Sequence, residues 1–496
     1  MPHRQRVWRC GDQAMTKGDD RLDVLMINTL AGVGGAAGVA GDLARTFRAR
    51  GHRCQMVVGH SVRPIEGVTL VPIGHPAVQS AIDWTIRHFS KGPFTRRLIP
   101  ALQRMKQSLE WPDTISQGRD YVGPAGSWKI MKTAARSPDI VHTHNLHSGF
   151  FDLRALPAIA AKAPVVMTLH DAWMLSGHCA HSFACTRWQG GCGECPDLSI
   201  QIALPFDRSA ENWSEKAAIY RQCRLRVATP SRWLMDKVER SMLWPAIIDA
   251  RVIPNGVDRS VFHPGDRDEE RRKLGLPLDA TILLFAANGI RQNIWKDYPT
   301  LEAAISRIRA RADRKVLFLA LGEDGPTQTL GATELRFLPA VPAGAATAAY
   351  YRAADLYVHA ARADNFPNVV IEALACGTPA VATAIGGIPE QIRSAGGPGA
   401  DNSAGIFGSD QATGVLTPPG DALAMAAAID NLCDDRSLLL RLGANAAQDA
   451  AMRFDLQKQA DIYLEWFCDI RARRSRERWS NRLGFTRATA VAVGQR

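Results

Sequence analysis

The sequence predicts an α/β protein with two doubly wound parallel sheets, one in each half of the chain. Strand-like and helix-like segments alternate on both sides of residues 250–260. A glycine-rich turn follows the first strand, as in strand–helix–strand units. The chain of 496 residues is too long for one compact core and suits two domains. With 46% hydrophobic and 22% charged residues, its composition is that of an ordinary globular protein.

The first unit of this pattern begins with a strand expected over Asp23–Asn28. The turn Gly32–Gly35 leads into a helix that Gly51 ends, and a second strand is expected over Cys54–Val58. The helix shows apolar residues at i, i+4 and i+8, which is the spacing of one buried face. These residues are Val39, Leu43 and Phe47.

Seven further buried strands are expected along the chain, separated by helical stretches. They are Ile140–His142, Val165–Leu169, Val227–Thr229, Ile282–Ala286, Val316–Leu321, Leu356–His359 and Ala380–Thr383. Residues 60–135 show no clear pattern apart from an amphipathic helix expected around Leu98–Leu109. Because ligands bind beyond the carboxyl ends of parallel strands, two such sheets predict a binding cleft between the domains.

Five segments follow from this pattern. We expect a disordered extension at 1–20, an N-terminal Rossmann-like domain at 21–250 with a cysteine-containing loop at 172–200, a C-terminal Rossmann-like domain at 251–450, a helix at 451–470 that packs back on the N-terminal domain, and a basic tail at 471–496. The translation start stays open between Met1 and a later Met.

The formal net charge of +11 is concentrated near the C-terminus. Residues 471–482 hold six arginines and one acid, Glu477. Two interpretations stay open: a solvated basic tail, or peripheral contact with anionic membrane lipid. We expect no nucleic-acid partner.

The segment Val24–Gly41 is uncharged, but its five glycines make it a poor membrane anchor. We therefore expect a cytoplasmic protein, peripheral at most to the inner face of the cell membrane.

The most informative segment runs from Asp364 to Pro379 and contains two acids eight residues apart, Asp364 and Glu372. A helical spacing of eight residues spans about 12 Å, comparable to the distance from a donor sugar across a diphosphate to its ribose. Amide groups at the helix N-terminus suit phosphate binding. The structural alternative is that Asp364 caps the helix and Glu372 lies on the surface.

This segment resembles the paired-acid motif of retaining glycosyltransferases of family 4, which have the GT-B architecture of two Rossmann-like domains. The family motif has Glu where this chain has Asp364 and Gly where it has Pro367. Since proline lacks an amide donor, the loop is expected to hold the donor somewhat differently.

The resemblance extends over residues 22–470 and implies that 21–250 is the acceptor domain and 251–450 the nucleotide-sugar donor domain. It also assigns roles to individual residues. Glu372 would bind the ribose and Asp364 the transferred sugar. Other donor contacts would come from Gly34, Gly35, Asn365, Phe366, Asn368 and Val369. His170, in Thr168–Asp171, resembles the family's active-site histidine, and Pro254–Asp258 resembles the start of its second domain. The acceptor side would be formed by His144, Asn145 and Asp171.

Arg291 and Lys296 resemble the family's basic pair that holds the donor phosphates, although Asp297 stands where Gly is usual. When the glycosidic bond breaks, negative charge gathers on the phosphate while the sugar becomes oxocarbenium-like. Two fixed cations can stabilise that charge, so no cofactor is required for catalysis. Asp266 and Asp268 are interpreted as first-turn acids of a helix rather than as metal ligands. Retention permits double displacement or same-face attack, and the absence of a compelling nucleophile favours the second.

Four cysteines lie within 17 residues: Cys179, Cys185, Cys192 and Cys195. Three interpretations stay open, namely a structural zinc site, free or redox-active thiols, and disulfides. Three nearby histidines are expected at a strand end lining the acceptor side: His142, His144 and His147. Cys376 is expected to be a small core residue.

The resemblance implies transfer of a hexose from a nucleotide-diphosphate sugar to a glycan or lipid-linked saccharide, in exopolysaccharide or lipopolysaccharide biosynthesis. Two alternatives stay open. One is a related epimerase or hydrolase of nucleotide sugars, and the other is a regulatory protein that binds nucleotide sugar without turnover.

Overall fold

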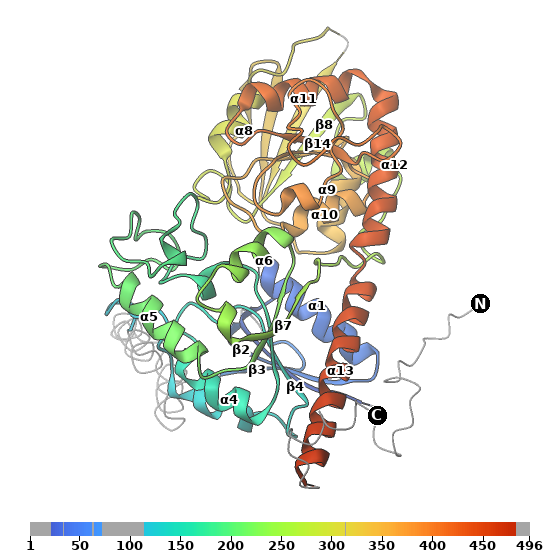
Figure 1. Cartoon of the computed structure of the whole chain (residues 1–496). Helices are drawn as coiled ribbons and strands as arrows, with labels where there is room; N and C mark the ends of the chain where they lie inside the picture. The colour runs from blue at the N-terminus through green and yellow to red at the C-terminus, as the bar shows by residue number, and fades with distance from the viewer. Residues whose placement is uncertain (1–20, 33, 62–63, 72–113, 313, 483–496) are drawn as a thin grey trace, which may run out of the picture.

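The computed structural model describes residues 21–32, 34–61, 64–71, 114–312 and 314–482, with backbone alone over 477–482. The expected extension at 1–20, the helix around Leu98–Leu109 and the tail beyond residue 482 lie outside the described residues. The described chain forms two α/β domains stacked end to end, with a long helix running from one along the other (Figure 1).

The described residues of the N-terminal domain form a seven-stranded parallel sheet in the order β3-β2-β1-β4-β5-β6-β7. Its strands are β1 (Asp23–Ala31), β2 (Arg53–Ser61), β3 (Val68–Leu70), β4 (Ile140–Thr143), β5 (Val165–Thr168), β6 (Leu225–Thr229) and β7 (Ile247–Val252). Its helices are α1 (Gly35–Ala49), α4 (Leu156–Lys162), α5 (Ser209–Tyr220) and α6 (Arg232–Glu239).

The described part of the C-terminal domain forms a second seven-stranded sheet in the order β10-β11-β9-β8-β12-β13-β14, in which the edge strand β10 alone is antiparallel. Its strands are β8 (Ala280–Ala286), β9 (Lys315–Leu321), β10 (Gln328–Leu330), β11 (Thr333–Leu338), β12 (Leu356–His359), β13 (Ala380–Thr383) and β14 (Gly414–Thr417). Its helices are α7 (Arg267–Leu274), α8 (Tyr298–Ile305), α9 (Ala345–Ala353), α10 (Asn368–Ala375), α11 (Ala422–Asp434) and α12 (Arg436–Arg453).

Short 3-10 helices complete the loops at η1 (Ala125–Lys132), η2 (Leu153–Ala155), η3 (Trp173–Leu175), η4 (Arg187–Gln189), η5 (Trp244–Ala246) and η6 (Ile388–Glu390). The two doubly wound sheets confirm the predicted GT-B fold class. Asp266 accepts a hydrogen bond from the amide of Glu269 at 2.9 Å and caps α7, in agreement with its interpretation as a helix-start acid.

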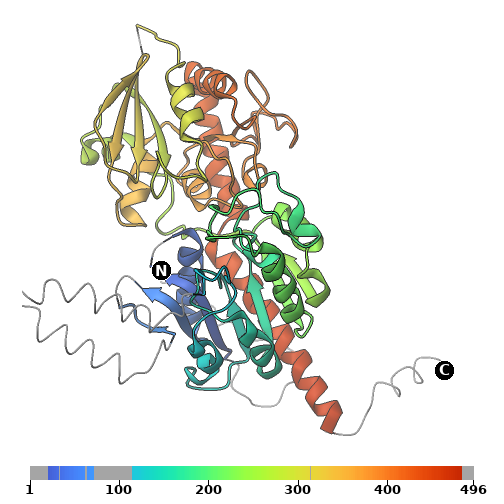
Figure 2. The same cartoon turned by 90° about the vertical axis from the view of Figure 1, so that its left-hand side faces the viewer.

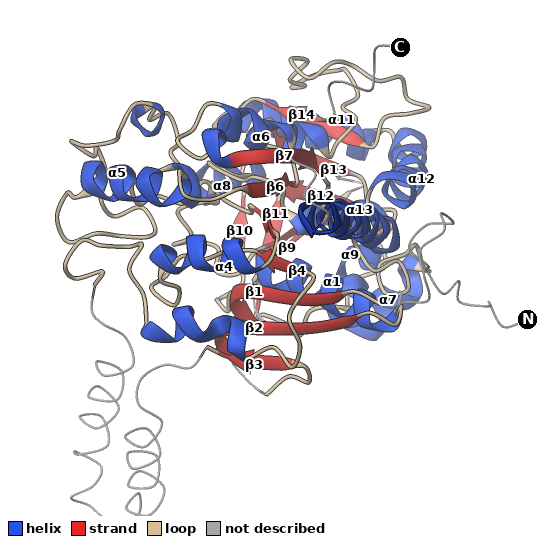
Figure 3. Ribbon diagram, turned by 60° about the horizontal axis from the view of Figure 1, so that its bottom comes forward, coloured by secondary structure: helices blue, strands red, loops and turns tan. Residues whose placement is uncertain are grey.

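Helices cover both faces of each sheet. On one face of the N-terminal sheet, residues of α4, α5 and α6 pack into a core with β4, β5 and β6. On the other face, α1 packs with the C-terminal helix α13 (Leu456–Arg482). Figure 3 shows the strands between these two helix layers. Because both faces of such a sheet are buried, the sequences of its central strands are continuous runs of apolar residues.

The helix α13 crosses from the C-terminal domain to the N-terminal one (Figure 2). Its apolar side chains pack into the core of the N-terminal domain, and they include Leu456, Tyr463, Trp466, Phe467 and Ile470. The structure extends this helix to Arg482, beyond the boundary predicted at residue 470. It also extends the N-terminal sheet to Val252, just past the boundary predicted at 250.

All nine predicted strands are present, and Leu356–His359 and Ala380–Thr383 have the predicted bounds. The prediction missed β3, β7, β10, β11 and β14. Several of these are short or carry partly exposed polar residues, so they lack a continuous apolar run. Among the described residues, no helix has the length and apolar character needed to cross a membrane.

Candidate active site

A cavity of about 410 Å³ lies between the two domains at the carboxyl ends of their strands. The N-terminal domain contributes the turn after β1, the start of α1 and the segments after β4 and β5. The C-terminal domain contributes the segments after β8 and β12. The cavity therefore lies where the order of strands predicts ligand binding in doubly wound sheets.

The helix α1 presents its N-terminus to this cavity. Gly34 precedes the helix with φ of 92°, a backbone conformation that glycine adopts without strain. A Cβ atom at Gly34 or Gly35 would meet no atom within 4 Å, so the space beside both residues is open. Since no side chain at Gly34 caps the helix, its first-turn amides are available to an anion such as a diphosphate.

A cation and a carboxylate from the C-terminal domain face this cavity together. Nζ of Lys296 donates to Oδ2 of Asp364 at 2.5 Å, and Nε2 of His359 lies 3.6 Å from the same oxygen. Burial alone would raise the pKa of Asp364, but Lys296 and His359 more than offset this effect and hold the pKa well below its usual range. Asp364 is therefore an ionised carboxylate at neutral pH.

The loop of Asp364 is held by a close backbone contact. A Cβ atom at Gly386 would lie 1.8 Å from the carbonyl oxygen of Asp364, and one at Gly387 would lie 1.9 Å from that of Asn365. Only glycine fits at both positions. The helix α10 begins at Asn368 after Pro367, whose side chain makes no capping bond. The structural alternative for Asp364 as a helix cap is therefore wrong.

On the opposite wall, His147, His170 and Asp171 line the cavity. Nε2 of His147 lies 2.9 Å from Oδ2 of Asp171, whose Oδ1 accepts from the amide of Trp173 at 2.9 Å. Burial lowers the pKa of His170 to about 4, although Asp171 opposes this shift. His170 is consequently a neutral imidazole at pH 7.

His144 was predicted on the acceptor side, but it lies beneath His170 and outside the cavity lining. The two rings stack at 5.2 Å, with Nδ1 of His144 2.9 Å from Nε2 of His170. His142 is also fully buried, 2.8 Å from the hydroxyl of Thr168. His142 on β4 and His144 directly after this strand are both buried, so His147 alone of the three histidines lines the cavity. Asn145 lines it as predicted.

The domains are joined beside the cavity by Asn365. Its Nδ2 donates to the carbonyl of His170 at 3.1 Å, and its Oδ1 accepts from the hydroxyl of Ser231 at 2.6 Å. Glu390 adds a second link, because its carboxylate accepts the backbone amides of Arg232 and Trp233 at 2.7 and 2.8 Å. This carboxylate satisfies first-turn amides of α6 from the other domain.

Of the predicted donor contacts, Gly34, Gly35, Lys296 and Asn365 line the cavity. Arg291 does not line it; its Nε donates to Glu323 at 2.5 Å and its guanidinium lies over the ring of Phe337. The remaining predicted contacts also lie outside the lining, namely Phe366, Asn368, Val369 and Glu372.

Each of these four residues has another partner in the structure. Phe366 is a core residue packed against Phe454. Asn368 donates to the carbonyl of Gly35 at 3.4 Å and so bridges the domains. Val369 packs against the core.

Glu372 accepts from the hydroxyl of Tyr351 at 3.1 Å. Burial raises the pKa of Glu372 to about 7; the bond from Tyr351 opposes this shift and Asp42 on α1 adds to it. Since Asp42 belongs to the N-terminal domain, Glu372 faces the interface between the domains. It is not the surface residue of the structural alternative.

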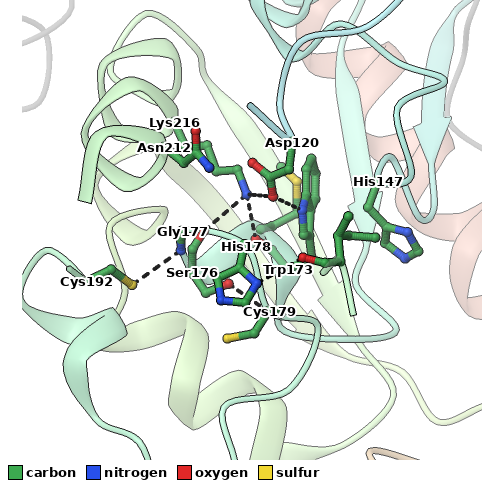
Figure 4. A network of polar contacts seen from close by, with 12 residues as sticks. Asp120, His147, Trp173, Ser176, Gly177, His178, Cys179, Cys192, Asn212 and Lys216 are labelled. Atoms are coloured by element: carbon green, nitrogen blue, oxygen red, sulfur yellow. Dashed lines mark hydrogen bonds and ion pairs between the residues drawn. The ribbon is translucent and has the colours of Figure 1, made fainter. Parts of the chain in front are cut away.

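The cysteine loop is braced by a buried ion pair beneath the cavity (Figure 4). Nζ of Lys216 donates to Asp120 at 3.0 Å and to the carbonyl of Ser176 at 3.1 Å, and it lies 3.8 Å from the ring centroid of Trp173. Nε1 of Trp173 donates to the same carboxylate. Because the amide of Trp173 also donates to Asp171, the Lys216–Asp120 ion pair supports the His147–Asp171 contact through Trp173.

The four clustered cysteines are free thiols, so the disulfide alternative is not supported. Within the described ranges, which include the whole loop, no group of three or more Cys, His, Asp or Glu side chains is placed to hold a metal ion. The zinc interpretation of Cys179, Cys185, Cys192 and Cys195 stays a prediction. The Cys192 sulfur accepts from the amide of Gly177 at 3.3 Å, and the Cys195 sulfur lies 3.1 Å from Nε2 of His178.

Several residues of the site were missed by the sequence-based prediction. They are His359, Gly386, Gly387, Glu390, His181, Trp233 and Trp295. The glycine pair in the loop after β13 was a signal for a close backbone approach. The aromatic residues had no signal in the sequence, since they come from three separate segments.

Two family models match most of the chain, and curated relatives match it over similar lengths. Residues 33–261 match the family described as "Glycosyltransferase Family 4", and residues 280–435 match "Glycosyl transferases group 1". D-inositol 3-phosphate glycosyltransferase 1 of Catenulispora acidiphila is 31% identical over 65% of this chain and 70% of its own. The putative colanic acid biosynthesis glycosyl transferase WcaC of Escherichia coli is 26% identical over 76% and 86%.

Solved structures show the same fold. Sucrose-phosphate synthase from Thermosynechococcus elongatus matches with a TM-score of 0.58 at 18% identity, covering 91% of this chain and 99% of that one. HepE of Anabaena in complex with UDP matches with a TM-score of 0.55 at 17% identity, covering 90% and 100%. With the two family matches and the curated relatives, these findings show that the chain is a glycosyltransferase and belongs to family 4.

Proposed function

We propose that this enzyme transfers a hexose from a nucleotide-diphosphate sugar to a saccharide or lipid-linked saccharide with retention of the anomeric configuration. The observation that carries this proposal is the convergence of Lys296 and Asp364 from one domain with Gly34 and Gly35 from the other in one cavity. A diphosphate needs cations and free amides, whereas an oxocarbenium-like sugar needs a carboxylate. The cavity offers both.

In this proposal, Lys296 and the first-turn amides of α1 stabilise the charge that gathers on the departing phosphate. Asp364 binds a hydroxyl of the transferred sugar and stabilises positive charge at its anomeric carbon. These groups need no metal ion, so we expect chelation of divalent ions to leave turnover intact.

Same-face attack is the step that the cavity supports better than double displacement. Of the described residues that line it, Asp171 and Asp364 are the carboxylates, and each already binds a neighbouring side chain. The acceptor oxygen would form the new bond to the anomeric carbon as the phosphate oxygen leaves with the bonding electrons. The leaving phosphate would then take the acceptor's proton. His147 and Asp171 would orient the acceptor hydroxyl.

We place this reaction in the synthesis of a cell-surface polysaccharide. WcaC, which is named for colanic acid biosynthesis, aligns over 86% of its own length and supports this assignment. The inositol-phosphate glycosyltransferases among the relatives indicate a second class of acceptor, a small polar alcohol. The two classes differ in whether the acceptor is itself a sugar.

The test is a panel of nucleotide sugars, scored for release of nucleotide diphosphate and for the anomeric configuration of the product by NMR. Retention together with acceptor-dependent release supports the proposal. An inverted product refutes the retaining mechanism. Release into water alone, or conversion to an epimer, indicates the related hydrolase or epimerase, and tight donor binding without turnover indicates a regulatory binding protein.

We further propose that the enzyme works in the cytoplasm at the inner face of the membrane. Arg473 and Arg476 are exposed on α13, whereas Arg471 and Arg474 bind backbone carbonyls of the N-terminal domain. Basic residues near an anionic bilayer contribute about 1 kcal/mol each. Arg473→Glu with Arg476→Glu should therefore weaken sedimentation with phosphatidylserine vesicles about tenfold or more, and equal sedimentation would refute the proposal.

A further inference from the structure

Four aromatic side chains from three segments meet at the cavity: His181 and Phe183 in the cysteine loop, Trp233 on α6 and Trp295 after β8. The rings of His181 and Trp233 stack at 5.4 Å with an angle of 14°, and those of Phe183 and Trp295 stack at 5.6 Å with an angle of 8°. His181 also meets Trp295 edge to face at 6.2 Å. His181, Trp233 and Trp295 line the cavity.

Trp295 is fixed close to the reacting groups. Its amide donates to Oδ1 of Asn293 at 3.1 Å, and its carbonyl accepts from the amides of Arg362 and Ala363 at 3.0 and 3.3 Å. Lys296 follows Trp295 in the chain, and Asp364 follows Ala363. The position of this indole ring is therefore tied to that of the Lys296–Asp364 pair.

His181 has a hydrogen-bond donor without a partner. Its Nδ1 accepts from the amide of Phe183 at 3.0 Å, so the proton of the neutral ring lies on Nε2. Burial lowers the pKa of His181 to about 4; Lys237 adds to this shift, while Asp364 and Asp171 oppose it. Nε2 is buried and has no hydrogen-bond partner among the described residues. A buried donor left unpaired is costly, so a ligand oxygen at this point would be stabilising.

We propose that His181, Trp233 and Trp295 form a subsite that binds one pyranose ring of a saccharide acceptor, which extends the function proposed above and rests on it. A pyranose has an apolar face of C–H groups that packs on aromatic rings, and hydroxyl oxygens that accept from Nε2–H of His181. Neither a purely apolar ligand nor a bare anion uses both features.

The subsite favours acceptor over donor because most of it belongs to the N-terminal domain, next to Asp171. Since Trp295 comes from the C-terminal domain, the subsite is complete only when the domains meet as they do here. The subsite also gives the cysteine loop a role, because this loop carries His181 and Phe183. The carbonyl of Ala180 accepts a hydrogen bond at 2.8 Å from the amide of Ala172, which follows Asp171, and this bond ties the loop to the active site. Sugar binding and domain closure are therefore coupled.

The test uses saturation-transfer NMR on the full chain with methyl α-glucopyranoside, methyl α-galactopyranoside and methyl α-mannopyranoside. Binding of UDP, GDP and ADP is measured in parallel on the same preparations. Trp295→Leu and Trp233→Leu remove a ring from each domain. Trp244→Leu is the matched control, since Trp244 is 41% exposed and lies outside the cavity lining.

We expect at least one glycoside to bind, with the strongest transfer to C–H protons on one face of its ring. Each of the two cavity variants should weaken that binding about three- to tenfold, the size of one lost ring contact. Nucleotide binding should persist in both, and the Trp244 control should behave like the parent protein.

The proposal is overturned if no glycoside binds to protein that binds nucleotide, or if glycoside binding is unchanged in Trp295→Leu and Trp233→Leu. A variant that has lost nucleotide binding as well is counted as misfolded, and the other variant then decides. Failure of the parent protein to bind any nucleotide would instead contradict the proposed donor, which separates the two proposals.

Discussion

Replacing Glu372 by Gln should make the protein more stable and a weaker binder of its donor. Burial raises the pKa of this carboxyl to about 7 from an ordinary value of 4.5. Because the folded pKa is raised, the contribution of Glu372 to stability is fully present below pH 4.5 and is lost as the pH rises through 7. The difference between these two pKa values corresponds to roughly 3 to 4 kcal/mol of folding free energy, since one pKa unit is worth about 1.36 kcal/mol.

Gln keeps the hydrogen bond from Tyr351 and the helix but carries no charge. Without ligand, Glu372→Gln should therefore raise the unfolding midpoint at pH 8 and leave it nearly unchanged at pH 4.5. Loss of a charged partner for the ribose hydroxyls should at the same time weaken donor binding by about 1.5 to 3 kcal/mol, which is roughly ten- to 150-fold.

The assay combines thermal unfolding at the two pH values with calorimetric titration of the donor. Glu302→Gln is a matched control, because Glu302 accepts from the hydroxyl of Tyr298 at 3.0 Å, as Glu372 does from Tyr351, but lies on α8, outside the segment Asp364–Pro379 that resembles the donor-binding motif. That variant should bind donor normally. A stability change in Glu372→Gln that is equal at both pH values, or an unchanged donor affinity, would refute the reasoning.

Three further predictions concern the charges around the cavity. Lys296→Ala should lower kcat about 10²- to 10³-fold, which is the scale for losing one group that stabilises developing charge. Arg291→Ala should lower kcat less than tenfold, because Glu323 holds Arg291 outside the cavity. Equal losses in the two variants would mean that Arg291 leaves Glu323 to reach the phosphates. Asp364→Asn should lower the unfolding midpoint, because it takes the charged partner away from Lys296. It should also reduce turnover at least about tenfold, with a smaller effect on binding of the free nucleotide diphosphate. Normal turnover would remove Asp364 from the reaction. Lys216→Met should destabilise the protein by about 3 to 5 kcal/mol in denaturant unfolding, since it leaves the fully buried Asp120 without its cation. A near-neutral effect would show that this ion pair does not stabilise the fold.

The sequence determined the fold class because each buried parallel strand can be recognised from its own short segment of sequence. Runs such as Leu356–His359 are apolar on both faces, and the glycines and prolines between them mark where each strand must end. Local signals also identified Asp364, Gly34 and Gly35, which lie in loops that follow strands or at a helix start. Strands with partly exposed residues, such as β7, leave no such signal and were missed.

Only the tertiary structure decided which side chains face the cavity. Arg291 and Lys296 are five residues apart in one loop, yet one pairs with Glu323 and the other with Asp364, because their partners come from different strands. The same holds for His144 and His147, of which one is buried beneath His170 and the other lines the cavity. The aromatic subsite unites rings that lie far apart in the sequence. Sequence spacing determines local periodicity and chain geometry, whereas burial, ion pairing and ring contacts depend on distances between segments that arise only in the folded chain.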